Sequence, residues 1–185
     1  MCSMRRHAPA RSWSARLAPA LVAAVLLGPD AAHAGFSFAS IDGGTIDLDD
    51  FKGQPVLVVN TASLCGFAAQ FDDLQALHDD YAARGLVVLA VPSNDFRQEL
   101  ASATEVKDYC AANFDLTIPM TDITPVLGDQ AHPFYRWLAE TEGFTPGWNF
   151  NKVLLDGEGA VVATWGSVTR PTAAPVVKRI EALLP

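Results

Sequence analysis

Residues 55–91 read PVLVVNTASLCGFAAQFDDLQALHDDYAARGLVVLAV. The two ends of this segment, Pro55–Asn60 and Leu86–Val91, are almost wholly apolar and rich in Val, which is typical of strands buried on both faces. Between them, apolar residues recur at helical spacing from about Phe67 to Ala83, and Arg84-Gly85 ends this expected helix. The order strand, helix, strand predicts a parallel pair joined by a right-handed crossover.

The flanking segments extend this unit into a complete domain. Alternating residues around the turn Asp42-Gly43-Gly44 predict an N-terminal β-hairpin. After the crossover unit, the patterns predict in order a helix 105–113 capped by Thr104, an extended piece 118–120, a helix 132–142, a strand pair 151–155 and 160–165, and a closing helix 171–184. A βαβ half followed by a ββα half predicts the α/β class and a thioredoxin-like fold, with a central mixed β-sheet flanked by helices.

The first 34 residues are organised like a secretory signal peptide. Residues 1–16 are basic, residues 17–27 are almost wholly apolar, and Ala32-His33-Ala34 offers a small-x-small cleavage site. The apolar run is too short to span a bilayer as a permanent helix. We therefore expect cleavage after Ala34, an exported and periplasmic domain at 35–185, and no stable membrane anchor. An uncleaved anchor or a misjudged start codon is the alternative.

Charge and cysteine content narrow the classes of function. Residues 1–34 hold four Arg and one Asp, so their removal changes the net charge from −8 to −11. A domain with this much negative charge is not expected to bind nucleic acid or anionic membranes. Only Cys65 and Cys110 remain after cleavage. Such a pair is compatible with either a structural disulfide or a redox couple.

Cys65 lies in the polar turn between the first buried strand and the first long helix. In α/β sheets this junction forms the usual ligand crevice, and a helix N-terminus favours the thiolate. The position predicts a reactive nucleophile, with a small buried core residue as the alternative. A thioredoxin-type oxidoreductase carries Cys-x-x-Cys here. The sequence is Cys65-Gly66-Phe67-Ala68, which favours attack by a single thiolate.

Three segments of the sequence resemble motifs of the glutathione peroxidase family, in the form of the family that carries cysteine rather than selenocysteine. Asn60-Thr-Ala-Ser-Leu-Cys65-Gly-Phe is similar to its first motif, Val91-Pro-Ser-Asn-Asp-Phe96 followed by Gln98-Glu99 to its second, and Gly147-Trp-Asn-Phe-Asn-Lys152 to its third. The resemblance covers nearly all of the expected mature chain. It implies a thiol peroxidase that reduces hydrogen peroxide or organic and lipid hydroperoxides.

The resemblance also implies a catalytic tetrad of Cys65, Gln98, Trp148 and Asn149. Amide and indole N–H groups stabilise a thiolate and a departing oxygen without competing as nucleophiles. The alternatives are a core aromatic for Trp148 and a turn residue for Asn149. Gln98 is the weakest match, because its loop is one residue shorter than in the family and lacks the usual glycines and proline. A solvated Gln98, with Arg97 intruding, is therefore the alternative there.

Cys110 lies on the expected helix 105–113, in a stretch similar to the helix that carries the resolving cysteine of thioredoxin-dependent family members. The implied role is to condense with the Cys65 sulfenic acid, after which a thioredoxin-like or other dithiol reduces the disulfide. The alternative is a core cysteine that shares a helix face with Val106. A disulfide needs Cα atoms within about 7 Å, so we expect this helix to unwind during turnover.

The remaining expectations concern ligands, assembly and rival functions. His78 and His132 show no paired metal-ligand spacing, so neither a metal nor a cofactor is expected. The family's tetrameric members carry a longer insertion than the 121–147 segment, which implies a monomer or weak dimer. One rival is an exported thiol–disulfide oxidoreductase, which the missing second cysteine disfavours. The other is a catalytically degenerate binding module, which the altered Gln98 loop favours.

Overall fold

A computed structural model of the chain describes residues 35–185, and the expected signal segment with its cleavage point after Ala34 lies outside the described residues. The central sheet has the strand order β4-β3-β5-β6. Its strands are β3 (Val56–Thr61), β4 (Val87–Pro92), β5 (Lys152–Leu155) and β6 (Val161–Trp165). β3 pairs parallel with β4 and antiparallel with β5, and β5 pairs antiparallel with β6. The mixed sheet expected from the sequence is therefore confirmed.

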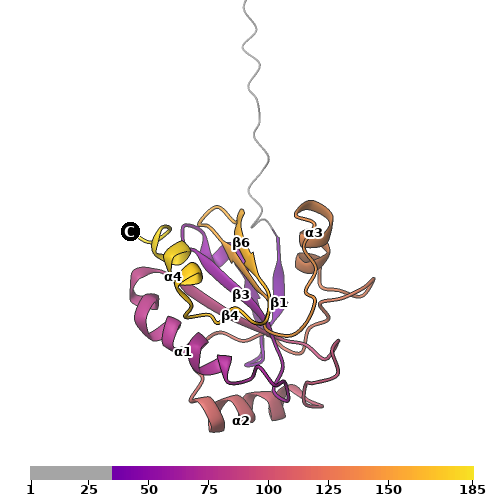
Figure 1. The fold of residues 1–185 in the computed structure, drawn as a ribbon. Coiled ribbons are helices and arrows are strands. Elements are labelled where there is room, and N and C mark those ends of the chain that lie inside the picture. The colour runs from indigo at the N-terminus through magenta and orange to yellow at the C-terminus, as the bar shows by residue number, and fades with distance from the viewer. Residues whose placement is uncertain (1–34) are drawn as a thin grey trace, which may run out of the picture.

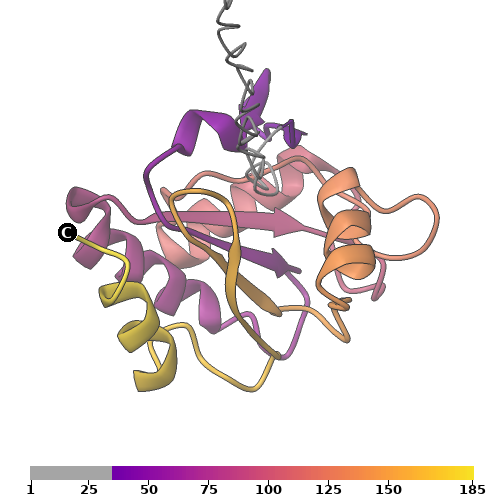
Figure 2. The ribbon, with the colours of Figure 1, turned by 90° about the horizontal axis from the view of Figure 1, so that it is seen from above.

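Helices cover both faces of this sheet. α1 (Gln70–Tyr81), α2 (Ala103–Phe114) and α4 (Ala174–Glu181) enclose one hydrophobic core, and α3 (Pro133–Thr141) covers the other (Figure 1, Figure 2). Alternate residues of β3 supply the two cores, with Leu57 facing α1 and Val58 facing α3. Both strands of the crossover are buried along their whole length, which explains why their sequences are continuously apolar.

The N-terminal hairpin packs against the second core. Its strands β1 (Ser37–Ala39) and β2 (Thr45–Asp47) are antiparallel, and a short 3-10 helix, η1 (Leu48–Phe51), follows them. The His132 ring stacks on Phe38 with centroids 3.9 Å apart. Its Nδ1 accepts the Phe134 N–H at 3.3 Å, and its Nε2 lies 3.0 Å from the Ser37 carbonyl oxygen. His132 therefore caps α3 and fastens the hairpin, which is a structural role.

Helix boundaries differ from the sequence predictions in three places. α1 begins at Gln70 rather than Phe67, because residues 67–69 form successive turns and Ala69 offers no capping side chain. A second 3-10 helix, η2 (Ala82–Arg84), follows α1.

α2 begins at Ala103, and its cap is Ser102 rather than Thr104. Ser102 Oγ accepts the Glu105 N–H at 3.3 Å and donates to the Glu105 carboxylate at 3.0 Å. α4 starts at Ala174 rather than Pro171.

Candidate active site

Cys65 lies in the tight turn between β3 and α1, at the carboxyl end of the sheet. The Cys65 carbonyl accepts the Ala68 N–H at 2.9 Å, and the sulfur accepts the Phe67 N–H at 3.5 Å. The turn leaves Cys65 only 6% exposed, whereas the preceding Leu64 is 59% exposed. Because α1 starts five residues after Cys65, a turn amide contacts the sulfur in place of the expected helix N-terminus.

The loop that carries Gln98 is tied directly to the Cys65 turn. The Leu64 N–H donates to the Gln98 carbonyl at 2.9 Å. The Ser63 N–H donates to the buried Glu99 carboxylate at 3.0 Å. Arg97 adopts a left-handed backbone with φ of 58° and its side chain is exposed, so it does not intrude on the turn. The shortened loop is therefore still hydrogen-bonded to the turn that carries Cys65.

Trp148 and Asn149 reach the same place from the turn before β5. The Asn149 side-chain amide donates to Gln98 Oε1 at 3.1 Å, so Gln98 is directed inward rather than solvated. Asn149 is fully buried, whereas Trp148 is 41% exposed and packs on Phe96 with ring centroids 5.1 Å apart. The structure thus brings Cys65, Gln98, Trp148 and Asn149 into one cluster of segments.

Asn60 fixes this turn to the end of β3. Its side-chain amide donates to the Trp148 carbonyl at 2.9 Å, and its Oδ1 accepts the Asn151 N–H at 3.0 Å. The strained turn residue Phe150, with φ of 60°, donates its N–H to the Asn60 carbonyl. Asn60 stands in the first sequence motif, but the motif alone predicts no role for it. A polar residue ending an otherwise apolar strand was the signal that it serves the site.

Lys152 is a second residue whose role was missed. Its ammonium is fully buried under the same turn and donates to Gln70 Oε1, the Phe150 carbonyl and the Thr169 carbonyl at 2.5, 2.8 and 2.6 Å. It thereby joins the start of α1, the Trp148–Phe150 turn and the segment before α4. Burial lowers the pKa of Lys152 to about 8. A lysine directly after a polar turn, at the start of an apolar strand, was the available signal.

Several buried polar side-chain atoms in the segments next to Cys65 lack a hydrogen-bond partner. Among the described residues, seven buried side-chain atoms lack a hydrogen-bond partner, and four of them are Thr61 Oγ1, Ser63 Oγ, Glu99 Oε2 and Asn149 Oδ1. Buried polar groups are normally paired, so an unpaired set calls for an explanation. A site that is prepared to bind and transform a polar substrate supplies one.

Cys110 lies on α2, as the sequence predicts, and it is a free thiol like Cys65. Both sulfurs belong to the hydrophobic core beneath α1 and α2. Burial, and after it the Glu99 charge, raises the pKa of the Cys110 thiol to about 12. In this state Cys110 is protonated at neutral pH and makes no disulfide.

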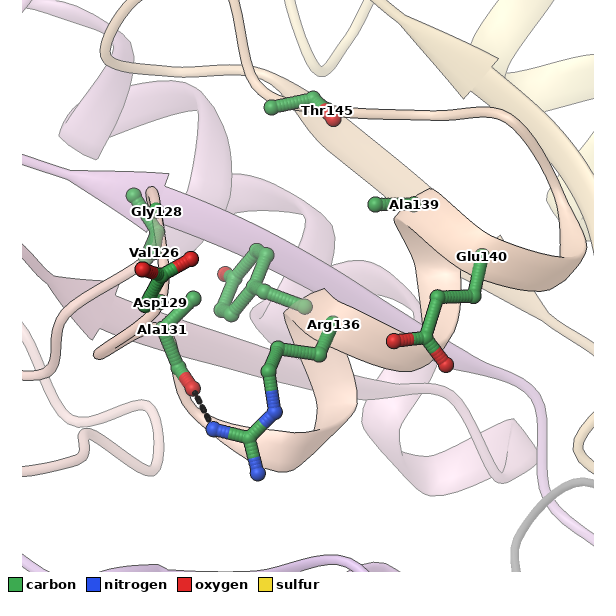
Figure 3. A pocket seen from close by; sticks show the side chains of 9 residues that line it. Val126, Gly128, Asp129, Ala131, Arg136, Ala139, Glu140 and Thr145 are labelled. Atoms are coloured by element: carbon green, nitrogen blue, oxygen red, sulfur yellow. Dashed lines mark hydrogen bonds between the residues drawn. The ribbon is translucent and has the colours of Figure 1, made fainter.

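Hollows lie beside the helices on both faces of the sheet. One, of about 240 Å³, adjoins the Cys65 turn and is lined by Gly66, Phe67, Ala69, Gln70, Val168 and Arg170. The other, of about 250 Å³, lies over α3; Asp129, Arg136 and Glu140 are among its lining residues, and Arg136 donates to the Ala131 carbonyl (Figure 3). Cys65 itself lines neither hollow, although its neighbours Gly66 and Phe67 line the first.

Within residues 35–185, no three metal-binding side chains gather into a possible ion site. None of the helices in this part of the chain is long and apolar enough to cross a membrane.

A thioredoxin-like domain that buries one cysteine in the turn after its first central strand, next to the segments that carry Gln98, Trp148 and Asn149, has the architecture of a thiol peroxidase. Comparison with known proteins supports this class. Residues 34–139 match the family model described as glutathione peroxidase. The chain belongs to the glutathione peroxidase family and is a peroxidase, an oxidoreductase that acts on hydroperoxides.

Individual relatives extend the match beyond residue 139. The chain is 39% identical over 161 residues to the hydroperoxy fatty acid reductase gpx1 of Synechocystis, covering 81% of this chain and 94% of that protein. It is 39% identical over 141 residues to a glutathione peroxidase of Lactococcus lactis, covering 74% and 90%. The crystal structure of Trgpx in apo form superposes with a TM-score of 0.59 at 33% identity, covering 81% of this chain and 96% of that one.

Proposed function

We propose that Cys65 is the peroxidatic residue of this enzyme. Its thiolate attacks the outer oxygen of a hydroperoxide. The S–O bond forms as the O–O bond breaks, the sulfur is oxidised to a sulfenic acid, and the departing oxygen takes a proton to leave as water or alcohol. The observation that carries the proposal is the Cys65 turn itself. It buries the sulfur, gives it the Phe67 amide, and is fastened to the Gln98 loop.

Gln98, Asn149 and Trp148 are proposed to supply the donors that this attack needs. Gln98 uses its oxygen to accept from Asn149, which leaves the Gln98 NH₂ group available to a ligand. The indole N–H of Trp148 is not engaged by another described residue. Donors held ready where charge develops are worth more than mobile ones, because they need no reorganisation during the reaction.

Cys110 is proposed to resolve the sulfenic acid. It attacks the Cys65 sulfur, an S–S bond forms, the S–O bond breaks, and water leaves. A thioredoxin-like or other dithiol then returns both cysteines to thiols. Because Cys110 is 1% exposed within α2, at least the middle of this helix must open in each cycle.

The preferred substrate is proposed to include organic and lipid hydroperoxides. The hollow beside the Cys65 turn is lined by apolar Phe67 and Val168, and Val168 is 82% exposed. Arg170 at its rim is held by Asp73 through two hydrogen bonds of 2.6 and 2.7 Å. Such a surface accepts the apolar tail of a peroxide whose O–O group lies at Cys65. The name of the Synechocystis relative, a hydroperoxy fatty acid reductase, agrees with this substrate class.

Export and assembly are proposed from the sequence. The basic, apolar and small-x-small order of residues 1–34 supports cleavage after Ala34 and a periplasmic enzyme. The short 121–147 segment supports a monomer or weak dimer. Mass spectrometry of the protein recovered from the periplasm, and light scattering of the mature chain, test these two statements. A protein that begins at Met1 or forms a stable tetramer contradicts them.

Peroxide consumption by wild type, Cys65→Ser and Cys110→Ser, with thioredoxin and glutathione in parallel, tests the cycle. We expect no turnover for the Cys65 variant and loss of thioredoxin-linked turnover for the Cys110 variant. Reduction of insulin disulfides without peroxide, at a rate typical of thioredoxins, would instead favour the oxidoreductase rival. A wild-type Cys65 that reacts no faster than free cysteine would favour a degenerate binding module.

A further inference from the structure

Ser167 contacts the candidate site from a segment that the proposed cycle does not use. It lies in the loop 166–173 between β6 and α4 and is half-buried. Its hydroxyl donates to the Asn149 carbonyl oxygen at 2.6 Å and accepts the Asn151 side-chain amide at 3.1 Å. A serine hydroxyl has one proton to donate. That proton is therefore committed to the backbone of Asn149, the residue whose side chain meets Gln98.

The backbone around Ser167 is itself held in place. The Gln70 side-chain amide donates to the Ser167 carbonyl at 2.6 Å. The Lys152 ammonium donates to Gln70 Oε1 at 2.5 Å and to the Thr169 carbonyl at 2.6 Å. Because Lys152 and Gln70 are both buried, bulk water does not compete for these bonds. The Ser167 hydroxyl thus reaches Asn149 from a fixed backbone.

The turn that receives this hydroxyl is strained. Phe150 directly follows Asn149 and has φ of 60°, a left-handed backbone that a bulky side chain rarely adopts. Such a conformation persists only when the surrounding structure imposes it. The Asn149 carbonyl belongs to the peptide group that joins these two residues. A hydrogen bond to that carbonyl therefore fixes the orientation of the peptide at the strained position.

The orientation of this peptide matters for the donors of the site. The Asn149 side-chain amide lies 3.1 Å from Gln98 Oε1, and misplacing such a group by about 1 Å can cost about a hundredfold in rate. Without the Ser167 hydroxyl, the Asn149 peptide is released and its side chain can move away from Gln98. Asn151 stays anchored, because its amide also donates to the Trp148 carbonyl at 2.7 Å. The consequence of losing the hydroxyl therefore falls on Asn149.

We propose that Ser167 is a positioning residue for the first half-reaction. Its hydroxyl holds the Asn149 carbonyl and thereby keeps the Asn149 amide on Gln98, beside the turn that carries Cys65. Ser167 acts through Asn149 and takes no part in making or breaking bonds. The inference rests on the proposed roles of Cys65 and Asn149.

A double-mutant cycle tests the proposal. Stopped-flow mixing of the reduced chain with hydrogen peroxide measures the second-order rate of Cys65 oxidation in wild type, Ser167→Ala, Asn149→Ala and the double variant. Hydrogen peroxide is used because it has no apolar tail that could contact the loop 166–173. Thr172→Val is the matched control, since Thr172 lies in the same loop but its hydroxyl donates to Asp73 Oδ1 at 3.0 Å.

We expect Ser167→Ala to slow Cys65 oxidation about tenfold, less than removal of the Asn149 amide, because the donor is displaced rather than lost. The double variant should react at the rate of Asn149→Ala, because residues that act as one unit are not additive. Thr172→Val should react as wild type. Ser167→Thr keeps a hydroxyl and Ser167→Val has the same shape without one, so Ser167→Val should be about tenfold the slower of this pair.

A wild-type rate in Ser167→Ala overturns the inference. A double variant about tenfold slower than Asn149→Ala also overturns it, since Ser167 then acts independently of Asn149. If Ser167→Ala does not fold, the Ser167→Thr and Ser167→Val pair carries the test, and equal rates in the pair overturn the inference. A wild-type rate in Asn149→Ala, or a wild-type Cys65 no faster than free cysteine, refutes the proposed site itself, so that failure is distinguishable from one confined to Ser167.

Discussion

Replacing Lys152 with methionine tests how the structure holds the Trp148–Phe150 turn in place. The substitution keeps most of the side-chain volume and removes the ammonium. It leaves three acceptors, on Gln70, Phe150 and Thr169, without the donor that they share. Lys152 has no exposed surface, so water cannot readily replace it.

The magnitude follows from two opposing effects. Each buried acceptor left unpaired costs about 1–3 kcal/mol, or roughly 6 kcal/mol for three. In the wild-type protein, burial of the Lys152 ammonium charge opposes folding, and the methionine variant avoids this cost. The Lys152 pKa of about 8, against an ordinary 10.5, corresponds to about 3 kcal/mol that the variant regains. We therefore expect Lys152→Met to lower the free energy of unfolding by about 3 kcal/mol at pH 7.

The pH dependence gives the sign of the electrostatic part. The folded-state pKa of Lys152 is below the unfolded value, so between pH 8 and 10.5 the unfolded chain binds more protons. Wild-type stability should therefore rise across this interval relative to Lys152→Met, and the difference between the two proteins should widen. Urea unfolding of the reduced proteins, followed by tryptophan fluorescence, measures it. The exposed Lys178→Met serves as control. A loss below about 1 kcal/mol, or a pH-independent difference, would refute the reasoning.

Three further predictions concern other parts of the chain. Ser102→Ala should lower the free energy of unfolding by about 1 kcal/mol by removing the cap of α2, as urea unfolding would measure, and an unchanged value would contradict the capping role of Ser102. Burial lowers the folded-state pKa of His132. The stabilising contribution of neutral His132 is therefore fully present above the unfolded pKa of about 6.5 and is lost as the pH falls. His132→Asn should flatten that part of the stability profile, and a profile like that of wild type would count against neutral His132 as the cap. Asn149→Ala should slow Cys65 oxidation in stopped-flow measurements by about a hundredfold, the effect of losing one positioned donor, and a wild-type rate would remove Asn149 from the site.

The sheet and its order of elements were predictable because they depend on local patterns. The Val-rich runs at Pro55–Asn60 and Leu86–Val91 are typical of buried strands, and the helical spacing between them indicated a crossover. Helix starts were less predictable. Phe67 continues the apolar spacing of α1, yet the chain forms turns there and places a backbone amide on the Cys65 sulfur. Thr104 looked like a cap, but Ser102 makes the reciprocal bonds with Glu105.

The sequence identified the candidate site residues, but it did not predict how their side chains contact one another. Family resemblance named Gln98, although its altered loop left open where the side chain points. The bond from Asn149 to Gln98 spans 51 residues, and no local pattern encodes it. Long-range packing of this kind becomes visible only when the chain is folded.

The central claim is that the Cys65 sulfur performs the first chemical step. Stopped-flow mixing of the reduced chain with hydrogen peroxide or an organic hydroperoxide, with mass spectrometry of quenched samples, measures that step directly. The account predicts that Cys65 is oxidised first and far faster than free cysteine, and that Cys65→Ser consumes no peroxide. Peroxide consumption that survives in Cys65→Ser, or oxidation that begins at Cys110, would contradict it.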